Sequence, residues 1–478
     1  MIYYEHFKHI PDNTLSDITK LFNEVLLQGS LPLDWKKNVT IPIYKSGDPL
    51  SSSNYRPITL APVLYKLFIS ILDTCLSSLF ETFDLIFPFQ NGFCKGRSVY
   101  NNLYHLLEVI TQSKNTGSPI ALAYLDIQKC YDSIEHWLIN ETFSKYGFND
   151  SITKLISNIY LNNTTQISTP YGLTEEIHIT RGVKQGCPMS PLIFILLSNP
   201  LLWWIHESST GLPIITDCIT NKLTSLAFAD DMTLLASSIT ELQSMISKVE
   251  KFNSRNGLAL SIETNISNPS KTVYTTNIPG PHSISITQST QIFQVLCISP
   301  QTSYKYLGMW INLDLNFDKQ MKIIQELVTR FINHIKNRCY STRQIADIVN
   351  KVMVPSIIYR SCFLPLSTSF LDSLNKKIAK VIYHKLYLPG WNCTSHIELP
   401  EAFGGFGISD LVALSYVQRV RILNQLINSS DIITSNVVPF CAQYPTTFSH
   451  QVFQSALIEV DAKLIKCPSP TFQRIQPC

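Results

Sequence analysis

The stretches Ile120–Ile127 (IALAYLDI) and Leu223–Ala236 (LTSLAFADDMTLLA) decide the fold of this chain. The first is a near-continuous apolar run, which predicts a strand that is buried on both faces and ends at Asp126. The second has two short apolar arms around Asp230 and Asp231, which predicts a hairpin with two carboxylates at its tip. Strands of this kind followed by helical patterns indicate a mixed α+β fold.

Helical patterns follow both stretches. The segment from Ser133 to Tyr146 predicts one helix that is closed by Gly147. Residues 238–241 (SITE) form a capping-box pattern, and an apolar stripe with helical spacing then runs to about Gly257. The apolar run 191–205 (PLIFILLSNPLLWWI) is shorter than the roughly 20 residues of a membrane span, so we expect a buried helix there.

Composition and charge narrow the class of protein. The chain has 478 residues, of which 45% are hydrophobic and 15% charged, and this excludes a disordered or acidic solvating protein. The formal net charge is only +3, yet residues 319–390 carry twelve Lys or Arg against three acids, a net +9. Apolar residues in this segment keep helical spacing, so its cations should lie on a solvated face. They serve either solubility or the binding of a polyanion.

The cysteines indicate a reducing environment. None of the twelve forms a C-x-x-C pair, and the first residues do not have the pattern of a signal peptide. We therefore expect free thiols, an intracellular location in the nucleus or cytoplasm, and no membrane partner.

Three carboxylates are candidates for metal chemistry, namely Asp126, Asp230 and Asp231. Nucleotidyl transfer needs hard oxygen ligands that hold two Mg²⁺ ions about 4 Å apart, and two strand-end acids brought together would supply them. An isolated Asp-Asp pair is more often a turn with local backbone hydrogen bonds. The pair alone therefore leaves both interpretations open.

The neighbouring residues form motifs in a fixed order. Four of them resemble the motifs of reverse transcriptases: 124–134 (YLDIQKCYDSI), 181–192 (RGVKQGCPMSPL), 227–231 (AFADD) and 306–308 (YLG). Others look like the fingers and the segment after the thumb of the non-LTR, LINE-type branch: 35–37 (WKK), 41–45 (IPIYK), 54–58 (NYRPI), 90–97 (QNGFCKGR) and 403–408 (FGGFGI). The resemblance implies an α+β right-hand polymerase with fingers, palm and thumb plus a helical C-terminal extension.

This resemblance also implies a domain order and an activity. Residues 1–117 would form the N-terminal segment and fingers, 118–310 the palm with inserted finger elements, 311–390 the thumb and 391–478 the C-terminal extension. The implied activity is RNA-directed DNA synthesis from an RNA template, a DNA primer and dNTPs. It would use two Mg²⁺ ions, with Mn²⁺ as an alternative.

Two other functions remain open. One is a decayed or host-adopted copy that binds nucleic acid without polymerising. The other is a viral RNA-dependent RNA polymerase, which would favour Gly-Asp-Asp at the hairpin in place of Ala229-Asp230-Asp231 and lacks the motifs found here at 54–58 and 306–308. The sequence does not predict the oligomeric state.

The resemblance assigns metal ligands. Asp126 and Asp230 would hold the two ions, with the Ile127 carbonyl as an additional oxygen. Asp231 would be the second acid of the pair, closer to the primer end. All three aspartates are thus the implied catalytic residues.

Other residues would bind the nucleotide. Tyr131 would be a steric gate beneath the sugar, because a ring there clashes with a 2′-hydroxyl. Lys45 and Arg56 would face the triphosphate, where cations offset its charge. Gln185 and Gly186 would contact the nucleotide and the template.

The basic segment adds two candidate residues, and Cys130 and Lys271 depart from the family pattern. Lys336 and Arg338 would follow the template–primer backbone. Cys130 stands where the family usually has alanine. Lys271 follows Ser261 by ten residues where about three are expected, which leaves open whether Lys271 is the proton donor to pyrophosphate.

Overall fold

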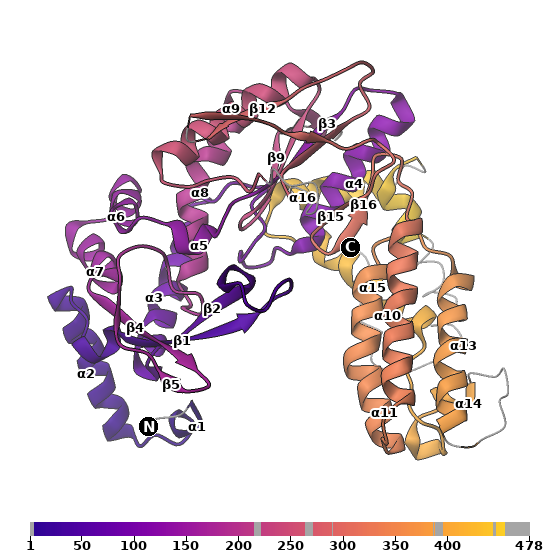
Figure 1. The fold of residues 1–478 in the computed structure, drawn as a ribbon, viewed down its shortest axis with the longest axis horizontal. Helices are drawn as coiled ribbons and strands as arrows, with labels where there is room; N and C mark the ends of the chain where they lie inside the picture. Colours follow the sequence, from indigo (N-terminus) through magenta and orange to yellow (C-terminus); the bar gives the residue numbers. More distant parts are fainter. Residues whose placement is uncertain are drawn as a thin grey trace.

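A five-stranded sheet forms the centre of the palm, in the upper part of Figure 1. The computed structural model describes residues 4–214, 221–262, 271–288, 290–385, 387, 395–442 and 446–454. The strand order is β14-β11-β3-β10-β9. The strands are β3 (Ala121–Asp126), β9 (Ser225–Phe228), β10 (Asp231–Ala236), β11 (Val273–Thr276) and β14 (Leu296–Cys297).

Helices and a hairpin cover the two faces of this sheet. On one face Met232 of β10 meets residues of α8 (Ser190–Glu207) and α9 (Ile239–Arg255). On the other face the ring of Tyr124 stacks on Tyr304 of the hairpin β15 (Tyr304–Tyr306) and β16 (Met309–Ile311), with centroids 4.2 Å apart. Asn102 of α4 (Val99–Thr116) donates to the Tyr306 hydroxyl on that face. The predicted strand buried on both faces is therefore confirmed.

The fingers contain a second sheet, built around the hairpin of β1 and β2. β1 (Lys37–Tyr44) pairs with β2 (Tyr55–Leu60) in antiparallel register and with β4 (Asn163–Thr169) in parallel. The same lobe contains five further helices and two short strands. These are α1 (Tyr4–Phe7), α2 (Asp12–Gln28), α3 (Val63–Thr82), α6 (His136–Lys145), α7 (Asp150–Tyr160), β5 (Gly172–Leu173) and β6 (Ile177–Ile179).

The helix α3 is long and apolar enough to cross a membrane by length and composition, a feature that was not predicted. One side of this helix nevertheless packs into the fingers. Phe68 contacts the rings of Phe22 and Trp35, and Phe80 contacts Tyr146 edge to face. The expected buried helix at residues 191–205 is confirmed, because α8 is buried along most of its length.

The helix predicted from about Ser133 to Tyr146 is confirmed as α6, but it begins three residues later than expected. Ser133 ends the short helix α5 (Cys130–Ser133), and two extended residues, Ile134 and Glu135, separate α5 from α6. The Ile134 carbonyl accepts from the Gly182 N–H at 2.7 Å, and Glu135 forms an isolated bridge with Arg181. These bonds to a distant segment take the backbone out of the helical conformation.

The thumb is a bundle of helices to the right of the palm in Figure 1. Its main helices are α10 (Asp318–Lys336), α11 (Thr342–Ile348), α12 (Val354–Ser361) and α13 (Thr368–Lys385). The expected helix with apolar spacing is confirmed, since Ile324 and Ile335 of α10 are buried. The predicted domain boundaries stay predictions.

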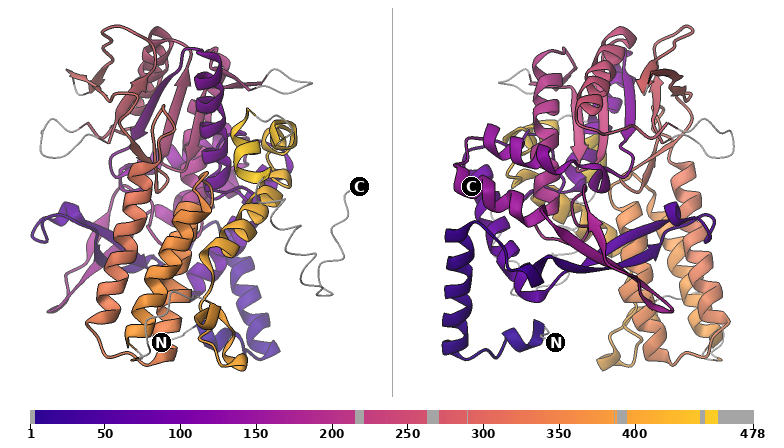
Figure 2. Two further views of the ribbon diagram at one scale, coloured as in Figure 1. Left: turned by 90° about the vertical axis from the view of Figure 1, so that its right-hand side faces the viewer. Right: turned by 60° about the vertical axis from the view of Figure 1, so that its left-hand side comes forward.

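The C-terminal helices connect thumb and palm, as both views of Figure 2 show. They are α14 (Ser395–Glu398), α15 (Leu411–Ile427) and α16 (Ile432–Ala442). Asn350, inside a π-helical turn, donates to the Gly407 carbonyl at 2.8 Å and accepts from the Ser409 N–H at 3.0 Å. A Cβ on Gly405 would lie 2.0 Å from the Leu399 carbonyl oxygen, so this turn requires glycine.

Short strand pairs complete the described palm and its loops. They are β7 (Leu212–Ile214) with β8 (Asn221–Leu223), and β12 (Ser285–Gln288) with β13 (Gln291–Gln294). The eight cysteines of the described ranges are all free thiols, as expected.

Candidate active site

Three carboxylates meet where the palm sheet ends. Asp231 is the first residue of β10 and lies opposite Asp126, the last residue of β3. Asp230 precedes it in the turn between β9 and β10. Directly opposed residues of an antiparallel pair have Cα atoms about 4.5 to 5.5 Å apart. The structure thus brings together the acids that the sequence predicted as a group.

The electrostatics of Asp231 reflect this crowding. Partial burial raises the pKa of the Asp231 carboxyl to about 6, and repulsion from Asp230 and Asp126 adds to the rise. The Asp231 side chain is still exposed to solvent, so protein atoms surround its carboxyl on one side only. Clustered carboxylates repel one another, and a divalent cation between them would relieve that repulsion.

Lys271 reaches the same site. Its Nζ lies 3.3 Å from Asp126 Oδ2, and the Tyr304 hydroxyl donates to its backbone carbonyl at 2.7 Å. Residues 263–270, which make the spacing from Ser261 long, lie outside the described residues. The longer spacing therefore does not remove Lys271 from the carboxylates.

Cys130 contacts the hairpin tip from the other side. Its Sγ donates to Asp230 Oδ2 at 3.3 Å. Burial raises the pKa of this thiol above its usual range, and the nearby Asp230 carboxylate adds to the rise. The thiol therefore stays protonated and acts as a hydrogen-bond donor to Asp230, which an alanine could not do.

The Ile127 carbonyl has a defined direction. Ile127 forms an isolated bridge with Leu260, and the bonds of that bridge use the Asp126 carbonyl and the Gln128 N–H. Carbonyls alternate in direction along an extended chain, so the Ile127 carbonyl points away from Leu260 and toward the β10 side.

These groups fit a hard divalent cation by type. Carboxylate oxygens and a backbone carbonyl are the ligands that Mg²⁺ prefers. As the side chains stand, no group of three or more Asp, Glu, His or Cys in the described ranges is arranged to hold a metal. Two of the acids are otherwise engaged, since Asp126 pairs with Lys271 and Asp230 accepts from Cys130.

Tyr131 lies close to Asp230 on the segment after β3. Its ring stacks on Phe194 of α8 with centroids 5.5 Å apart, and its backbone carbonyl accepts from the Val183 N–H. The side chain is half-buried, and burial raises the pKa of the phenol above its usual range. The palm thus supports one side of the ring, while part of it remains exposed.

The loop around Gln185 and Gly186 packs against the end of β2. Gly186 has a φ of 110°, and a Cβ there would lie 2.9 Å from the Thr59 carbonyl oxygen. The Gln185 carbonyl accepts from the Thr59 N–H at 2.7 Å, and its side-chain amide donates to Asp132 Oδ1 at 3.0 Å. Packing alone accounts for the glycine, and the contact of both residues with a nucleotide stays a prediction.

Lys184 is a buried cation beneath this loop. Its side chain is 5% exposed, and its Nζ has no hydrogen-bond partner among the residues that the structure describes. The Nζ lies 4.4 Å from the centroid of the Tyr65 ring. The pKa of Lys184 is lowered to about 8, mainly by burial. Nearby Lys36 contributes to the lowering, and Cys187 opposes it.

The other predicted cations lie on the two lobes, away from the cluster of carboxylates. Lys45 follows β1, and Arg56 pairs with Ile43 on the exposed β1–β2 hairpin. Figure 1 draws this hairpin as pointing from the fingers toward the thumb. Lys336 ends α10 and Arg338 follows it, both exposed, at the end of the thumb far from the palm (Figure 1).

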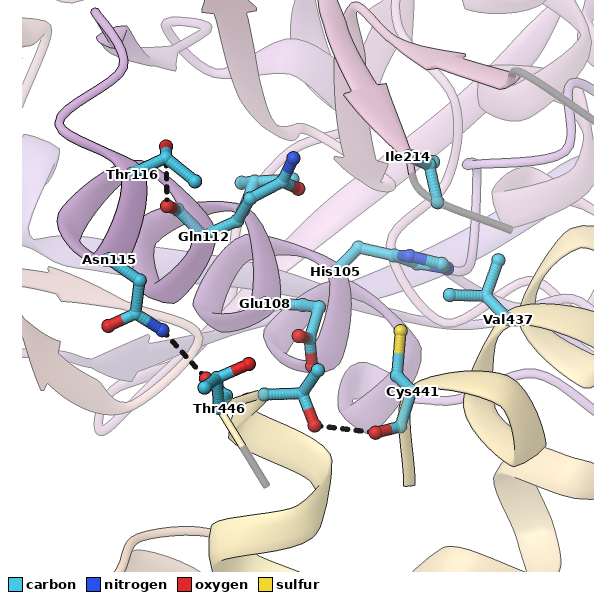
Figure 3. Close-up of a pocket in the computed structure, with 11 residues that line it drawn as sticks. His105, Glu108, Gln112, Asn115, Thr116, Ile214, Val437, Cys441 and Thr446 are labelled. Carbon is cyan, nitrogen blue, oxygen red and sulfur yellow. Dashed lines mark hydrogen bonds between the residues drawn. The ribbon is translucent and has the colours of Figure 1, made fainter. Parts of the chain in front are cut away.

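A cavity of about 330 Å³ lies between α4 and α16 (Figure 3). Burial lowers the pKa of His105 in its lining to about 4 and raises that of Glu108. Glu108 accepts from the Ser449 N–H and hydroxyl, at 3.2 and 3.0 Å. These groups link α4 to the C-terminal segment, and none of the described residues in the lining is a predicted site residue.

The burial of two polar side chains, Gln90 and Lys184, was not predicted, although both residues lie inside quoted motifs. The signal was a polar side chain within a glycine-containing motif, which indicates contact with a neighbouring backbone. Burial of that side chain depends on segments distant in sequence. Such burial therefore could not be read from local periodicity.

The fold and this cluster define a right-hand polymerase. A palm sheet presents carboxylates at its end, and a fingers lobe and a helical thumb flank it (Figure 1). A family model described as "Reverse transcriptase (RNA-dependent DNA polymerase)" matches residues 37–311, more than half of the chain. The chain belongs to the reverse transcriptase family.

Similar curated proteins come from non-LTR retrotransposons. The chain is 25% identical over 400 residues to a Pol polyprotein from retrotransposable element R2 of Popillia japonica, covering 81% of this chain and 52% of that protein. It is 26% identical over 411 residues to the R2DM polyprotein of Drosophila melanogaster, covering 85% and 37%. The polymerase from the mobile element jockey is 23% identical over 325 residues, covering 66% and 33%. The chain thus spans about a third to a half of these relatives.

Solved structures that are similar to this one include the apo telomerase of Candida tropicalis. That likeness covers 97% of this chain and 73% of the other, with 11% identity and a TM-score of 0.42.

The free energy of unfolding of the parent should rise with pH in the alkaline range, and Lys184→Met should remove this rise. The folded-state pKa of about 8 lies below the usual lysine value of 10.5, so between these values the unfolded chain binds more protons. The free energy of unfolding of the parent should therefore rise with pH in that range, by at most about 1.4 kcal/mol per unit, relative to Lys184→Met. Urea unfolding of both proteins from pH 7 to 10 measures the difference. Parallel profiles would show that Lys184 is not desolvated.

Proposed function

We propose that this chain is an RNA-directed DNA polymerase that extends a DNA primer along an RNA template. The observation that carries the proposal is the register that sets Asp126 opposite Asp231, with Asp230 adjacent, at the end of the palm sheet. Two bound Mg²⁺ ions would activate the primer 3′-hydroxyl and offset the charge of the leaving pyrophosphate. The three carboxylates and the Ile127 carbonyl would hold them.

The chain's own residues would supply the remaining steps. Asp126 would exchange its ion pair with Lys271 for a metal ligand, and Asp230 would exchange the Cys130 hydrogen bond in the same way. Lys271 Nζ then stays close to the site with a proton to donate to pyrophosphate. This supports an active enzyme over a decayed copy, because the longer segment before Lys271 still delivers it to the carboxylates.

Nucleotide and nucleic acid would bind around this centre. Tyr131 would carry the deoxyribose on its exposed side, and Gln185 and Gly186 would contact the base pair from the loop. Lys45 and Arg56 would approach the triphosphate from the exposed β1–β2 hairpin. The thumb cations would follow the template–primer backbone. We further propose that the protein acts in the nucleus or cytoplasm without a membrane partner.

Asp126→Asn and Asp230→Asn should each abolish DNA synthesis. Loss of one carboxylate that would hold a metal ion is expected to lower dTTP incorporation on poly(rA)/oligo(dT) by about 10³-fold or more, the equivalent of about 4 kcal/mol in the barrier. Binding of the template–primer should remain. Asp17→Asn, on the outer helix α2, is the matched control and should retain parental incorporation. A parent that binds template–primer but incorporates no dTTP would instead indicate the non-polymerising copy.

Tyr131→Val should admit ribonucleotides and keep most dNTP activity. Removal of the ring opens space for a 2′-hydroxyl without touching the carboxylates, and one steric contact of this kind is worth about 10² to 10³ in selectivity. Tyr131→Phe keeps the ring and should discriminate as the parent does. Single-nucleotide incorporation of rNTP and dNTP measures the ratio. Parental discrimination by Tyr131→Val would place the gate elsewhere.

Lys336→Gln combined with Arg338→Gln should weaken template–primer binding. Each lost phosphate contact is expected to flatten the dependence of log K on log salt by about one unit of slope. The matched control is Lys145→Gln with Lys154→Gln, on helices α6 and α7 of the fingers. Binding is measured by fluorescence anisotropy at several salt concentrations. An unchanged slope in the thumb variant would favour a solubility role for these cations.

A further inference from the structure

The segment Gln90-Asn91-Gly92 lies along the outer edge of β9. The Asn91 N–H donates to the Ala227 carbonyl, and the Ala227 N–H donates to the Phe89 carbonyl, each at 2.9 Å. Gln90 and Ala227 also form an isolated parallel bridge. Since β9 is the edge strand of the palm sheet, this segment extends the sheet by one short piece directly behind the acidic hairpin.

The side chain of Gln90 reaches the hairpin turn itself. Its Oε1 accepts from the Ala229 N–H and from the Gly92 N–H, both at 3.0 Å. Gln90 is 0% exposed, so water cannot replace it as the acceptor. Two N–H donors directed at one oxygen fix the orientation of the amide. Its Nε2 then has no partner among the described residues, so the acceptor oxygen is the part of the amide that is used.

The turn depends on this acceptor. Ala229 has a φ of 55°, in the left-handed region that residues with a side chain rarely adopt. Without Gln90 the Ala229 N–H would be buried with no acceptor, which disfavours the observed turn. The two segments are also in direct contact, because a Cβ on Gly92 would lie 2.4 Å from the Ala229 nitrogen.

We propose that Gln90 is a positioning residue for the metal site. It fixes the backbone of Ala229 and thereby the Cα of Asp230, the next residue, without contacting substrate or ion. Ligand sets work only within about 0.5 Å of the productive geometry, so a loosened turn weakens ion binding before it disturbs the fold. The inference rests on the proposed function, in which Asp230 is a metal ligand.

Arg97 provides a matched control on the same segment. Its Nη1 donates to the carbonyls of Phe87, Pro88 and Gln90, at 3.1, 3.0 and 3.0 Å. Arg97→Met therefore loosens the segment but leaves the hydrogen bond from the Ala229 N–H to Gln90 Oε1 in place. Gln90→Glu keeps an acceptor oxygen and replaces the unused Nε2 with a second carboxyl oxygen, whose charge when ionised would attract a cation to the site.

The test is Mn²⁺ binding to the full chain without substrate, measured by electron paramagnetic resonance and calorimetry. Gln90→Met should weaken binding by about 10-fold or more, as the loss of groups behind metal ligands usually does. Gln90→Glu should bind Mn²⁺ no more than about 3-fold more weakly than the parent, and Arg97→Met should stay within about 3-fold, although Arg97→Met lowers the melting temperature. If Gln90→Met does not fold, Gln90→Asn, whose amide is one methylene too short, takes its place under the same criteria.

The contrary outcomes separate the two proposals. Parental Mn²⁺ affinity in Gln90→Met, or an equal loss in Arg97→Met, overturns the role of Gln90 and leaves the carboxylate site standing. A parent chain that binds no Mn²⁺ overturns the metal site and with it this inference.

Discussion

The register between β3 and β10 is the constraint on which the site depends. Side chains alternate between the two faces of a strand, so a slip of one residue would send Asp231 and Asp126 to opposite faces. Six consecutive pairs, from Ala121 with Ala236 to Asp126 with Asp231, hold the register. β3 is buried on both faces up to Leu125, so a slip would also displace packed side chains on each side of the sheet.

The end of the sheet is held by backbone contacts from segments that are far apart in sequence. Residues 90–92 pair with β9, and the segment near Leu260 pairs with Ile127 at the end of β3. The loop at Gly186 makes a similar backbone contact with β2 of the fingers sheet. Glycine stands at two of these places because a Cβ at Gly92 or Gly186 would collide with the neighbouring backbone. The glycines of these motifs are therefore explained by the close approach of two backbone segments and not only by the chemistry of the site.

The sequence patterns correctly predicted those elements that depend on interactions between residues close together in the chain. The buried strand, the acidic hairpin and the Ser238 cap of α9 follow from periodicity and from a side chain that reaches its own helix end. A capping box would also have a hydrogen bond from the Ser238 N–H to the Glu241 carboxylate, but this bond does not form. The carboxylate accepts instead from the N–H groups of Ser237, Thr210 and Gly211. The late start of α6, after the extended residues Ile134 and Glu135, has the same cause. In both places a partner distant in sequence offers a hydrogen bond that local patterning cannot show.

The distribution of charge suits the palm and the thumb to different partners. With a net charge of +3 the whole chain exerts little long-range attraction, and salt screens what remains beyond about 8 to 10 Å. Cations close to the palm carboxylates would pair with them, as Lys271 already does with Asp126, and would compete with a divalent ion. A thumb segment of +9 on a separate helical lobe avoids this competition. Such a lobe can attract a phosphate backbone through local contacts while the acids at the end of the sheet remain accessible to metal.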